Sequence, residues 1–216
     1  MFEIIPSILT ASPQEVKEML LRVEEAGCER AQVDIVDGVF ASNKTIDPSA
    51  IAGFETGLSL DFHLMTKEPI DWAERALHAG AERIIGQIEL MTDQAAFIGK
   101  VQAGGTLVGL ALDIDTPVSR IDKEILTSLD TVLVMSVKAG QGGQVFNEKA
   151  LAKIKSLQEA KAKDETPFRI CVDGGITFQN IRAVISAGAD EVAIGRRLFE
   201  GDFNDNISKF TEAAAV

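Results

Sequence analysis

The stretch Ala31-Gln-Val-Asp-Ile-Val-Asp-Gly38 holds a carboxylate, Asp34, within a short apolar run that ends in a turn-forming glycine. The pattern returns as Cys171-Val-Asp-Gly-Gly-Ile176, where Asp173 closes the apolar run. Placing a carboxylate at the end of a buried strand costs free energy, because its charge loses water. Asp is also a common turn residue, so each one could be a simple cap. Together, Asp34 and Asp173 form a candidate acid–base pair.

Short β-branched runs alternate with amphipathic stretches along the whole chain. The apolar runs are Ile4–Leu9, Ala31–Ile35, Leu58–Leu64, Arg83–Ile88, Thr106–Leu112, Thr131–Val137, Phe168–Val172 and Glu191–Ile194. Helix-period stretches lie between them, such as Pro13–Ala26 and Asn147–Ala162. Glycines at 27, 80 and 188 each follow an alanine at the expected end of a helix and precede the next strand.

Eight alternations with short connections predict parallel strands joined by right-handed crossovers. They favour a closed (β/α)8 TIM barrel over a doubly wound open sheet. No linker or low-complexity segment divides the chain, so residues 1–216 are expected to form a single domain.

Composition restricts the partners. The 216 residues carry a formal net charge of −12, which argues against nucleic acid and anionic membranes as partners. Cys28 and Cys171 have no metal-binding spacing, and the start of the chain lacks a signal core. No apolar run approaches the roughly 20 residues of a membrane helix. We therefore expect a cytoplasmic protein with free thiols and with small-molecule ligands.

Polar residues stand at the ends of several predicted strands. In a barrel these carboxyl ends gather around one mouth, where ligands bind. The residues concerned are Ser7, Gln32, Asp34, Asp61, His63, Gln87, Glu89, Ser136 and Asp173. Side chains two positions apart share a side of a strand, which pairs Gln32 with Asp34 and Asp61 with His63. His63 is either a hydrogen-bonded core histidine or a ligand.

Three glycine-rich segments follow predicted strands in the last third of the chain. They are Ala139-Gly-Gln-Gly-Gly-Gln144, Asp173-Gly-Gly175 and Gly195-Arg196. Glycine lets backbone amides approach an oxygen-rich anion, and barrels frequently bind phosphate on the loops after the seventh and eighth strands. Tight turns without a ligand are the alternative.

Taken together, these motifs resemble the ribulose-phosphate 3-epimerase family over essentially the whole chain. The motifs are Pro6-Ser-Ile-Leu9, Val33-Asp-Ile-Val-Asp-Gly38 with Phe40 and Asn43, Asp61-Phe-His-Leu-Met65, Met135-Ser-Val137, Gly140-Gln-Gly-Gly-Gln-Val-Phe146 and Val172-Asp-Gly-Gly-Ile176. The resemblance implies a metal-assisted epimerisation of a pentulose 5-phosphate, such as D-ribulose 5-phosphate to D-xylulose 5-phosphate.

The resemblance also implies a role for each matching residue. Asp34 and Asp173 would be the two acid/base groups and metal ligands, and His63 would be a further ligand that also contacts substrate. The substrate and phosphate would be held by Ser7, Gly140, Gln141, Gly142, Gly143, Gly174, Gly175, Gly195 and Arg196. Met65 and Met135 would line the site beside the reacting carbons.

The chain departs from the family pattern at the expected metal. Gln32 stands in the place of a family histidine ligand, and Gln87, Val39, Gln141 and Arg196 also differ from the family residues. A site of Asp34, His63, Asp173 and Gln32 is rich in oxygen and suits Mg²⁺ or Mn²⁺ better than Zn²⁺, with weaker binding, and Zn²⁺, Fe²⁺, Mn²⁺ and Mg²⁺ all stay open as the metal.

Three interpretations remain open: an epimerase with an altered divalent metal, an epimerase or isomerase of another ketose phosphate, and a non-catalytic sugar-phosphate binder without metal. A related decarboxylase is disfavoured because Ile35, Val36 and Asp37 leave no lysine after Asp34. A purely structural role would leave the glycine segments unexplained. We expect a small sugar phosphate as ligand and assembly as a homo-oligomer.

Overall fold

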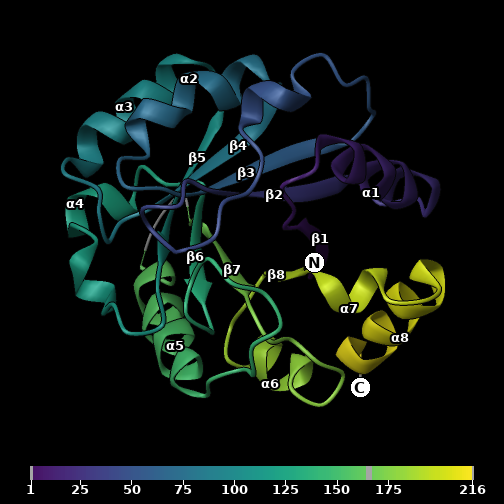
Figure 1. Ribbon diagram of the computed structural model, residues 1–216. Helices are drawn as coiled ribbons and strands as arrows, with labels where there is room; N and C mark the ends of the chain where they lie inside the picture. The colour runs from purple at the N-terminus through teal and green to yellow at the C-terminus, as the bar shows by residue number, and fades with distance from the viewer. Residues whose placement is uncertain (1, 164–166, 216) are drawn as a thin grey trace.

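The computed structural model describes residues 2–163 and 167–215, and eight strands in this part of the chain form a closed parallel barrel (Figure 1). They follow one another around the barrel in chain order: β1 (Glu3–Ile8), β2 (Arg30–Val36), β3 (Ser59–Met65), β4 (Ala81–Gln87), β5 (Leu107–Leu112), β6 (Thr131–Met135), β7 (Arg169–Asp173) and β8 (Glu191–Ile194). Parallel pairing of β1 with β8, for example Ile5 with Ala193, closes the ring. The predicted (β/α)8 barrel is confirmed, and the open sheet is wrong.

Helices cover the outside of the barrel (Figure 1). They are α1 (Pro13–Glu25), α2 (Ile70–His78), α3 (Gln94–Ala103), α4 (Lys123–Leu126), α5 (Lys149–Lys161), α6 (Ile181–Ser186), α7 (Arg196–Phe199) and α8 (Phe203–Ala215), with short 3₁₀ helices η1 (Pro48–Ile51) and η2 (Val118–Arg120). The three predicted helix-ending glycines have φ values of +73°, +82° and +114°, as a C-terminal glycine cap requires. No helix in the described residues is both long enough and apolar enough to cross a membrane.

The connection from β2 to β3 differs from the regular alternation, because η1 is its one helical element. The side chain of Asp47 accepts a hydrogen bond from Ser49 N (2.9 Å), and Pro48 follows as the first residue of η1. A short 3₁₀ turn therefore replaces the helix that the repeat predicts here, and the preceding residues form an irregular loop beside the mouth of the barrel.

Apolar side chains form two layers. The larger one lies between strands and helices and includes Val16 and Leu20 of α1 and Phe62 of β3. The smaller one contains Ile5, Leu133 and other side chains on the inner face of the strands. Because alternate residues of a strand point to opposite faces, each strand supplies both layers, and its polar inner residues stand above or below the inner apolar layer.

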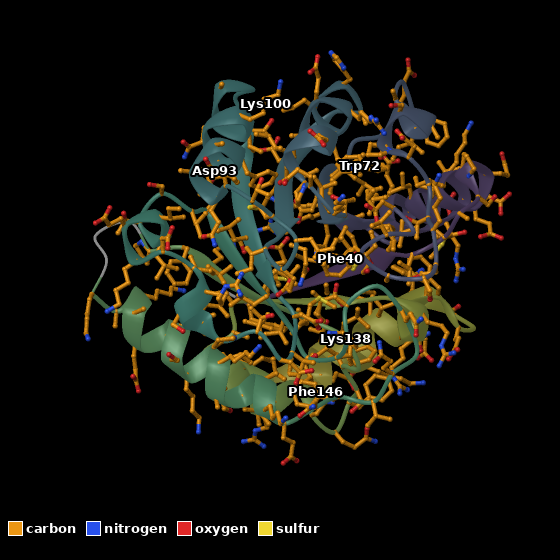
Figure 2. All side chains as sticks on the ribbon, turned by 60° about the vertical axis from the view of Figure 1, so that its left-hand side comes forward. Phe40, Trp72, Asp93, Lys100, Lys138 and Phe146 are labelled. Atoms are coloured by element: carbon orange, nitrogen blue, oxygen red, sulfur yellow. The ribbon has the colours of Figure 1, made fainter. Side chains whose placement is uncertain are left out.

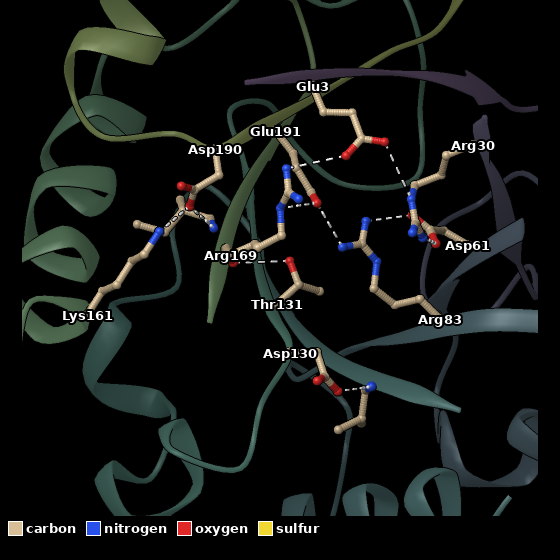
Figure 3. A network of polar contacts seen from close by, with 12 residues as sticks. Glu3, Arg30, Asp61, Arg83, Asp130, Thr131, Lys161, Arg169, Asp190 and Glu191 are labelled. Carbon is tan, nitrogen blue, oxygen red and sulfur yellow. Dashed lines mark hydrogen bonds and ion pairs between the residues drawn. The ribbon is translucent and has the colours of Figure 1, made fainter. Parts of the chain in front are cut away.

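Six charged side chains form a network at the amino-terminal ends of the strands (Figure 3), which we call the floor network: Glu3, Arg30, Asp61, Arg83, Arg169 and Glu191. Arg83 is 2% exposed, and its Nη2 lies 2.5 Å from Asp61 Oδ2. Its Nη1 lies 2.9 Å from Glu191 Oε2. Charges buried this deeply are tolerated because they are paired.

The position of Asp61 corrects the expectation that it faces the mouth beside His63. Its second oxygen lies 2.6 Å from Arg30 Nη1, at the start of β2 (Figure 3). Asp61 and His63 both point into the barrel, but residues two positions apart on a strand are separated by about 6.6 Å. Asp61 therefore belongs to the floor network, and His63 belongs to the layer above it.

Candidate active site

A pocket of about 340 Å³ opens at the carboxyl ends of the strands. It brings together most of the site residues that the sequence predicts: Ser7, Asp34, Met65, Met135, Gly140, Gln141, Gly142, Gly143, Asp173, Gly174, Gly175, Gly195 and Arg196. The two remaining predicted residues, Gln32 and His63, do not line it. They are fully buried beneath it and contact its acidic wall.

The carboxylates of Asp34 and Asp173 approach each other across the barrel from β2 and β7. The side-chain amide of Gln32 joins them: its Nε2 donates to Asp34 Oδ1 at 2.9 Å and to Asp173 Oδ2 at 2.7 Å. Ser7 Oγ donates to the other Asp34 oxygen at 2.6 Å. The pair is thus fixed from β1 and β2, with one edge open to the pocket.

Two effects raise the pKa of Asp173 from 3.8 to about 7. Burial disfavours its charged form, and the nearby charge of Asp34 disfavours it further. His63, the Gln32 amide and the Gly174 N–H act in the opposite direction and do not cancel this. Near neutral pH, Asp173 therefore exists both as an acid and as a carboxylate, which is what a group that both donates and accepts protons needs.

His63 lies in the wall of the same site. Its Nδ1 is 3.2 Å from Asp34 Oδ1, and its Nε2 is 2.8 Å from Gln87 Oε1 on β4. Burial lowers the pKa of His63, but the hydrogen bond to Asp34 and the charges of both aspartates outweigh this and raise it. Gln87 therefore fixes one ring nitrogen, so that the other faces the two carboxylates.

The residues fit a divalent cation. Ligand atoms of Asp34, His63 and Asp173 lie within 4.8 Å of one another and are buried. Gln32 Oε1 is buried and has no hydrogen-bond partner among the described residues. Half a turn of this amide would exchange Nε2 for Oε1 and present a carbonyl oxygen to the point between the carboxylates. Three oxygen ligands and one imidazole nitrogen suit a divalent metal ion.

Gly142, Gly143, Gly175 and Gly195 line the pocket and are called here the glycine wall. Gly175 has a φ of +62°, and a Cβ there would lie 2.4 Å from Phe146 N. No side chain fits at that position, so two loop backbones meet closely there. The Arg196 guanidinium lies against Gly143, and Arg196 Nε lies 3.1 Å from Glu200 Oε1. A cation thus stands beside the glycine wall in a protein whose overall charge is strongly negative.

Several further pocket residues were missed by the sequence interpretation: Leu9, Met19, Val137, Gln144, Ile176, Ala193, Ile194, Arg197 and Phe199. Most of them adjoin a predicted motif, so extending each motif by one or two residues would have found them. Met19 is different, because it lies on α1 and is far in sequence from the end of any strand. No local signal in the sequence distinguishes it from the other apolar residues of that helix.

The fold and the site define a (β/α)8 barrel whose mouth places two carboxylates beside a glycine-lined pocket. Residues 3–199 match the model of the family described as Ribulose-phosphate 3 epimerase. The chain belongs to this family, and it is therefore an isomerase of the epimerase class.

Curated relatives agree with this assignment. Over 198 residues the chain is 36% identical to "Ribulose-5-phosphate-3-epimerase, chloroplastic" of Arabidopsis thaliana, covering 90% of this chain and 70% of that protein. It is 30% identical to "Ribulose-phosphate 3-epimerase" of Treponema pallidum (strain Nichols), covering 99% and 98%. Among solved structures, a 3-hexulose-6-phosphate synthase superposes with a TM-score of 0.70 at 17% identity, over 98% of this chain and 99% of the other, which shows the shared fold.

Proposed function

We propose that the protein interconverts D-ribulose 5-phosphate and D-xylulose 5-phosphate by proton transfer at C3, with Asp34 and Asp173 as the two acid/base groups. The observation that carries this proposal is the pair itself. The two carboxylates share the Gln32 amide, and the pKa of one of them is raised to about 7. Groups poised in this way are suited to removing a proton and returning it.

Epimerisation requires that a proton leave C3 on one face and return on the other. The hydrogen on C3 is acidic because the neighbouring C2 carbonyl can accept the charge as an enediolate. One aspartate takes the proton as a carboxylate, and the other donates one from the opposite face as an acid. The reverse reaction exchanges their roles, which a group with a pKa near 7 permits.

The surroundings of the pair hold the reacting carbon in a dry site. Met65 and Met135 present apolar surface to the pocket and are almost fully buried. Ser7 fixes Asp34 through its 2.6 Å hydrogen bond. Exclusion of water strengthens every charged interaction with the enediolate oxygens.

Asp34, His63, Asp173 and Gln32 would hold a divalent metal ion. When bound, such an ion supplies Lewis-acid stabilisation of the enediolate. The carbonyl of Gln32, in place of an imidazole, makes the ligand set harder, which favours Mn²⁺ or Mg²⁺ over Zn²⁺ or Fe²⁺.

The glycine wall would bind the 5-phosphate. Gly142, Gly143, Gly175 and Gly195 line the pocket, and the side chain of Arg196 stands next to Gly143. An anion held there fixes the sugar at a distance from the aspartates and orients C3 between them.

A second candidate is epimerisation of another ketose phosphate. Val39 is 64% exposed on the loop after β2. Gln141 lines the pocket, and its Nε2 donates to Ser42 Oγ at 3.4 Å, joining the loops after β6 and β2 over the mouth. Gln141 lines the pocket and Val39 differs from the family residue, so these two positions would change which ketose phosphate is accepted.

An epimerisation assay in D₂O tests the proposal. Wild-type protein should convert ribulose 5-phosphate and place solvent deuterium at C3. Asp34→Asn and Asp173→Asn should each lower kcat by about three orders of magnitude or more while the protein stays folded, and the exposed control Asp115→Asn should not change it. Near wild-type rates in either variant would refute that assignment. Equal conversion of an unphosphorylated ketose would refute the phosphate site, and faster conversion of a hexulose 6-phosphate would favour the second candidate.

A further inference from the structure

Asp113 directly follows β5 and is buried, although it does not line the pocket. Its Oδ1 accepts hydrogen bonds from Ile114 N at 2.8 Å and from Ala139 N at 3.0 Å. Its Oδ2 lies 2.6 Å from Lys138 Nζ. One carboxylate thus binds two consecutive residues of the segment that follows β6.

That segment, residues 138–144, is called here the glycine loop. Its residues 140–144 all line the pocket. Lys138, labelled in Figure 2, is the first residue of the segment, and Phe146, also labelled there, lies two residues beyond its end. Gln144 folds the loop on itself, since its Nε2 donates to Lys138 O and to Gln141 O, each at 2.7 Å. The loop is therefore a compact unit whose root lies at Lys138 and Ala139, and its Gln141 side chain makes one further contact, with Ser42.

The root is where the loop meets the barrel wall. No backbone–backbone hydrogen bond joins residues 138–145 to the rest of the described chain. The Ala139 N–H donates instead to the side chain of Asp113, which is itself held in place: its backbone N donates to Glu89 Oε1 at 2.8 Å, and its carbonyl accepts from Lys153 Nζ at 2.5 Å. Asp113 therefore supplies the attachment that main-chain pairing does not provide.

We propose that Asp113 is a positioning residue for phosphate binding: its carboxylate fixes the root of the glycine loop, so that the loop amides face the pocket before the ligand arrives. The inference rests on the proposed phosphate site and adds a residue that touches neither substrate nor metal. Preorganisation of this kind strengthens binding, because the loop does not have to be ordered when the ligand binds.

The two contacts that Asp113 makes with the glycine loop, to Ala139 N and to Lys138 Nζ, differ in strength. The Ala139 amide and the carboxylate are both buried, whereas the Lys138 side chain is 69% exposed. The Lys138 ammonium stays largely in water, which weakens its attraction to the buried carboxylate. The hydrogen bond to the loop backbone should therefore dominate, and a neutral side chain that keeps an acceptor oxygen should preserve most of the function.

Four variants separate these contributions: Asp113→Ala, Asp113→Asn, Lys138→Met and, as an exposed control beside the site, Asp115→Ala. Two measurements apply to each folded variant. Hydrogen exchange of residues 138–145 reports the order of the loop, and competitive inhibition by inorganic phosphate reports binding at the pocket. The KM and kcat for ribulose 5-phosphate complete the set.

We expect Asp113→Ala to speed exchange in the loop and to weaken phosphate inhibition about tenfold, with KM rising more than kcat falls. Asp113→Asn should restore most of both, Lys138→Met should have a small effect, and the control none. Unchanged exchange in Asp113→Ala, or faster exchange with unchanged phosphate inhibition, would overturn the inference. Failure of the wild-type protein to epimerise or to bind phosphate would instead refute the proposed function. The exchange data would then still show whether Asp113 orders the glycine loop.

Discussion

The strongest test of the acid–base assignment is a stability measurement on Asp173→Asn. Asparagine has nearly the shape of aspartate and keeps an oxygen for the Gln32 Nε2 donor, which lies 2.7 Å from Asp173 Oδ2. It cannot ionise. The substitution therefore removes the charge from a buried position next to Asp34 and leaves the packing nearly unchanged.

The magnitude follows from the raised pKa. A pKa of about 7 in the folded protein against 3.8 corresponds to about 4 kcal/mol at 1.36 kcal/mol per unit. The folded state holds this proton more tightly, so the contribution to stability is complete below about pH 4 and is lost as pH rises to about 7. Asp173→Asn has no carboxyl proton to lose at this position. The free energy of unfolding of the variant, relative to wild type, should therefore increase by about 2 kcal/mol between pH 5.5 and pH 8.

Urea unfolding with a chelator present measures this difference at both pH values. The lower value stays above the isoelectric point of about 4.6, where solubility is poorest. Groups that do not interact with Asp173 titrate alike in both proteins and cancel in the comparison, whereas His63, whose pKa the Asp173 charge helps to raise, contributes to the measured difference. Asp115→Asn, an exposed aspartate, serves as the control and should show no change with pH. A stability difference for Asp173→Asn that is the same at pH 5.5 and pH 8 would show that Asp173 is an ordinary carboxylate.

Two further predictions concern the metal and the barrel floor. Gln32→His should tighten Zn²⁺ binding about tenfold or more in calorimetric titration, because imidazole is the softer ligand. Equal, tight affinity in both proteins would show that Gln32 does not weaken the site, and no binding by either would favour a metal-free sugar-phosphate binder. Arg83→Met should lower the free energy of unfolding by about 3–5 kcal/mol, because Asp61 and Glu191 would lose a buried partner. Arg75→Met, which removes the exposed pair with Asp47, should cost about 1 kcal/mol or less, and similar losses in both would contradict this reasoning.

Periodicity alone was sufficient to predict the barrel. Strand β8 was predicted at its observed bounds, and every other strand within two residues at each end, because buried parallel strands are short apolar runs between glycine-marked turns. The connection through η1 was not predictable in this way. Its conformation depends on the Asp47 cap and on the loop that packs over the mouth, and neither gives a periodic signal.

The sequence predicted most residues of the site, but not the layer of the barrel in which each side chain lies. Most predicted residues meet in one pocket, because the carboxyl ends of parallel strands converge. The sequence could not place Asp61, since a strand pattern specifies the face of a side chain and not the layer. Nor could it identify Asp113 as the root of the glycine loop, because that contact joins residues 26 positions apart.

The floor network has a consequence for how such a barrel can be divided. Arg83 on β4 pairs with Glu191 on β8, and Glu3 on β1 pairs with Arg169 on β7. Each half of the chain thus supplies charges that the other half neutralises. A fragment ending after β4 would expose these groups without their partners, so its polar interior would resist closing on itself. Chimaeric barrels assembled from this chain and a relative should therefore succeed only when both pieces carry matching floor charges, however similar their outer helices are.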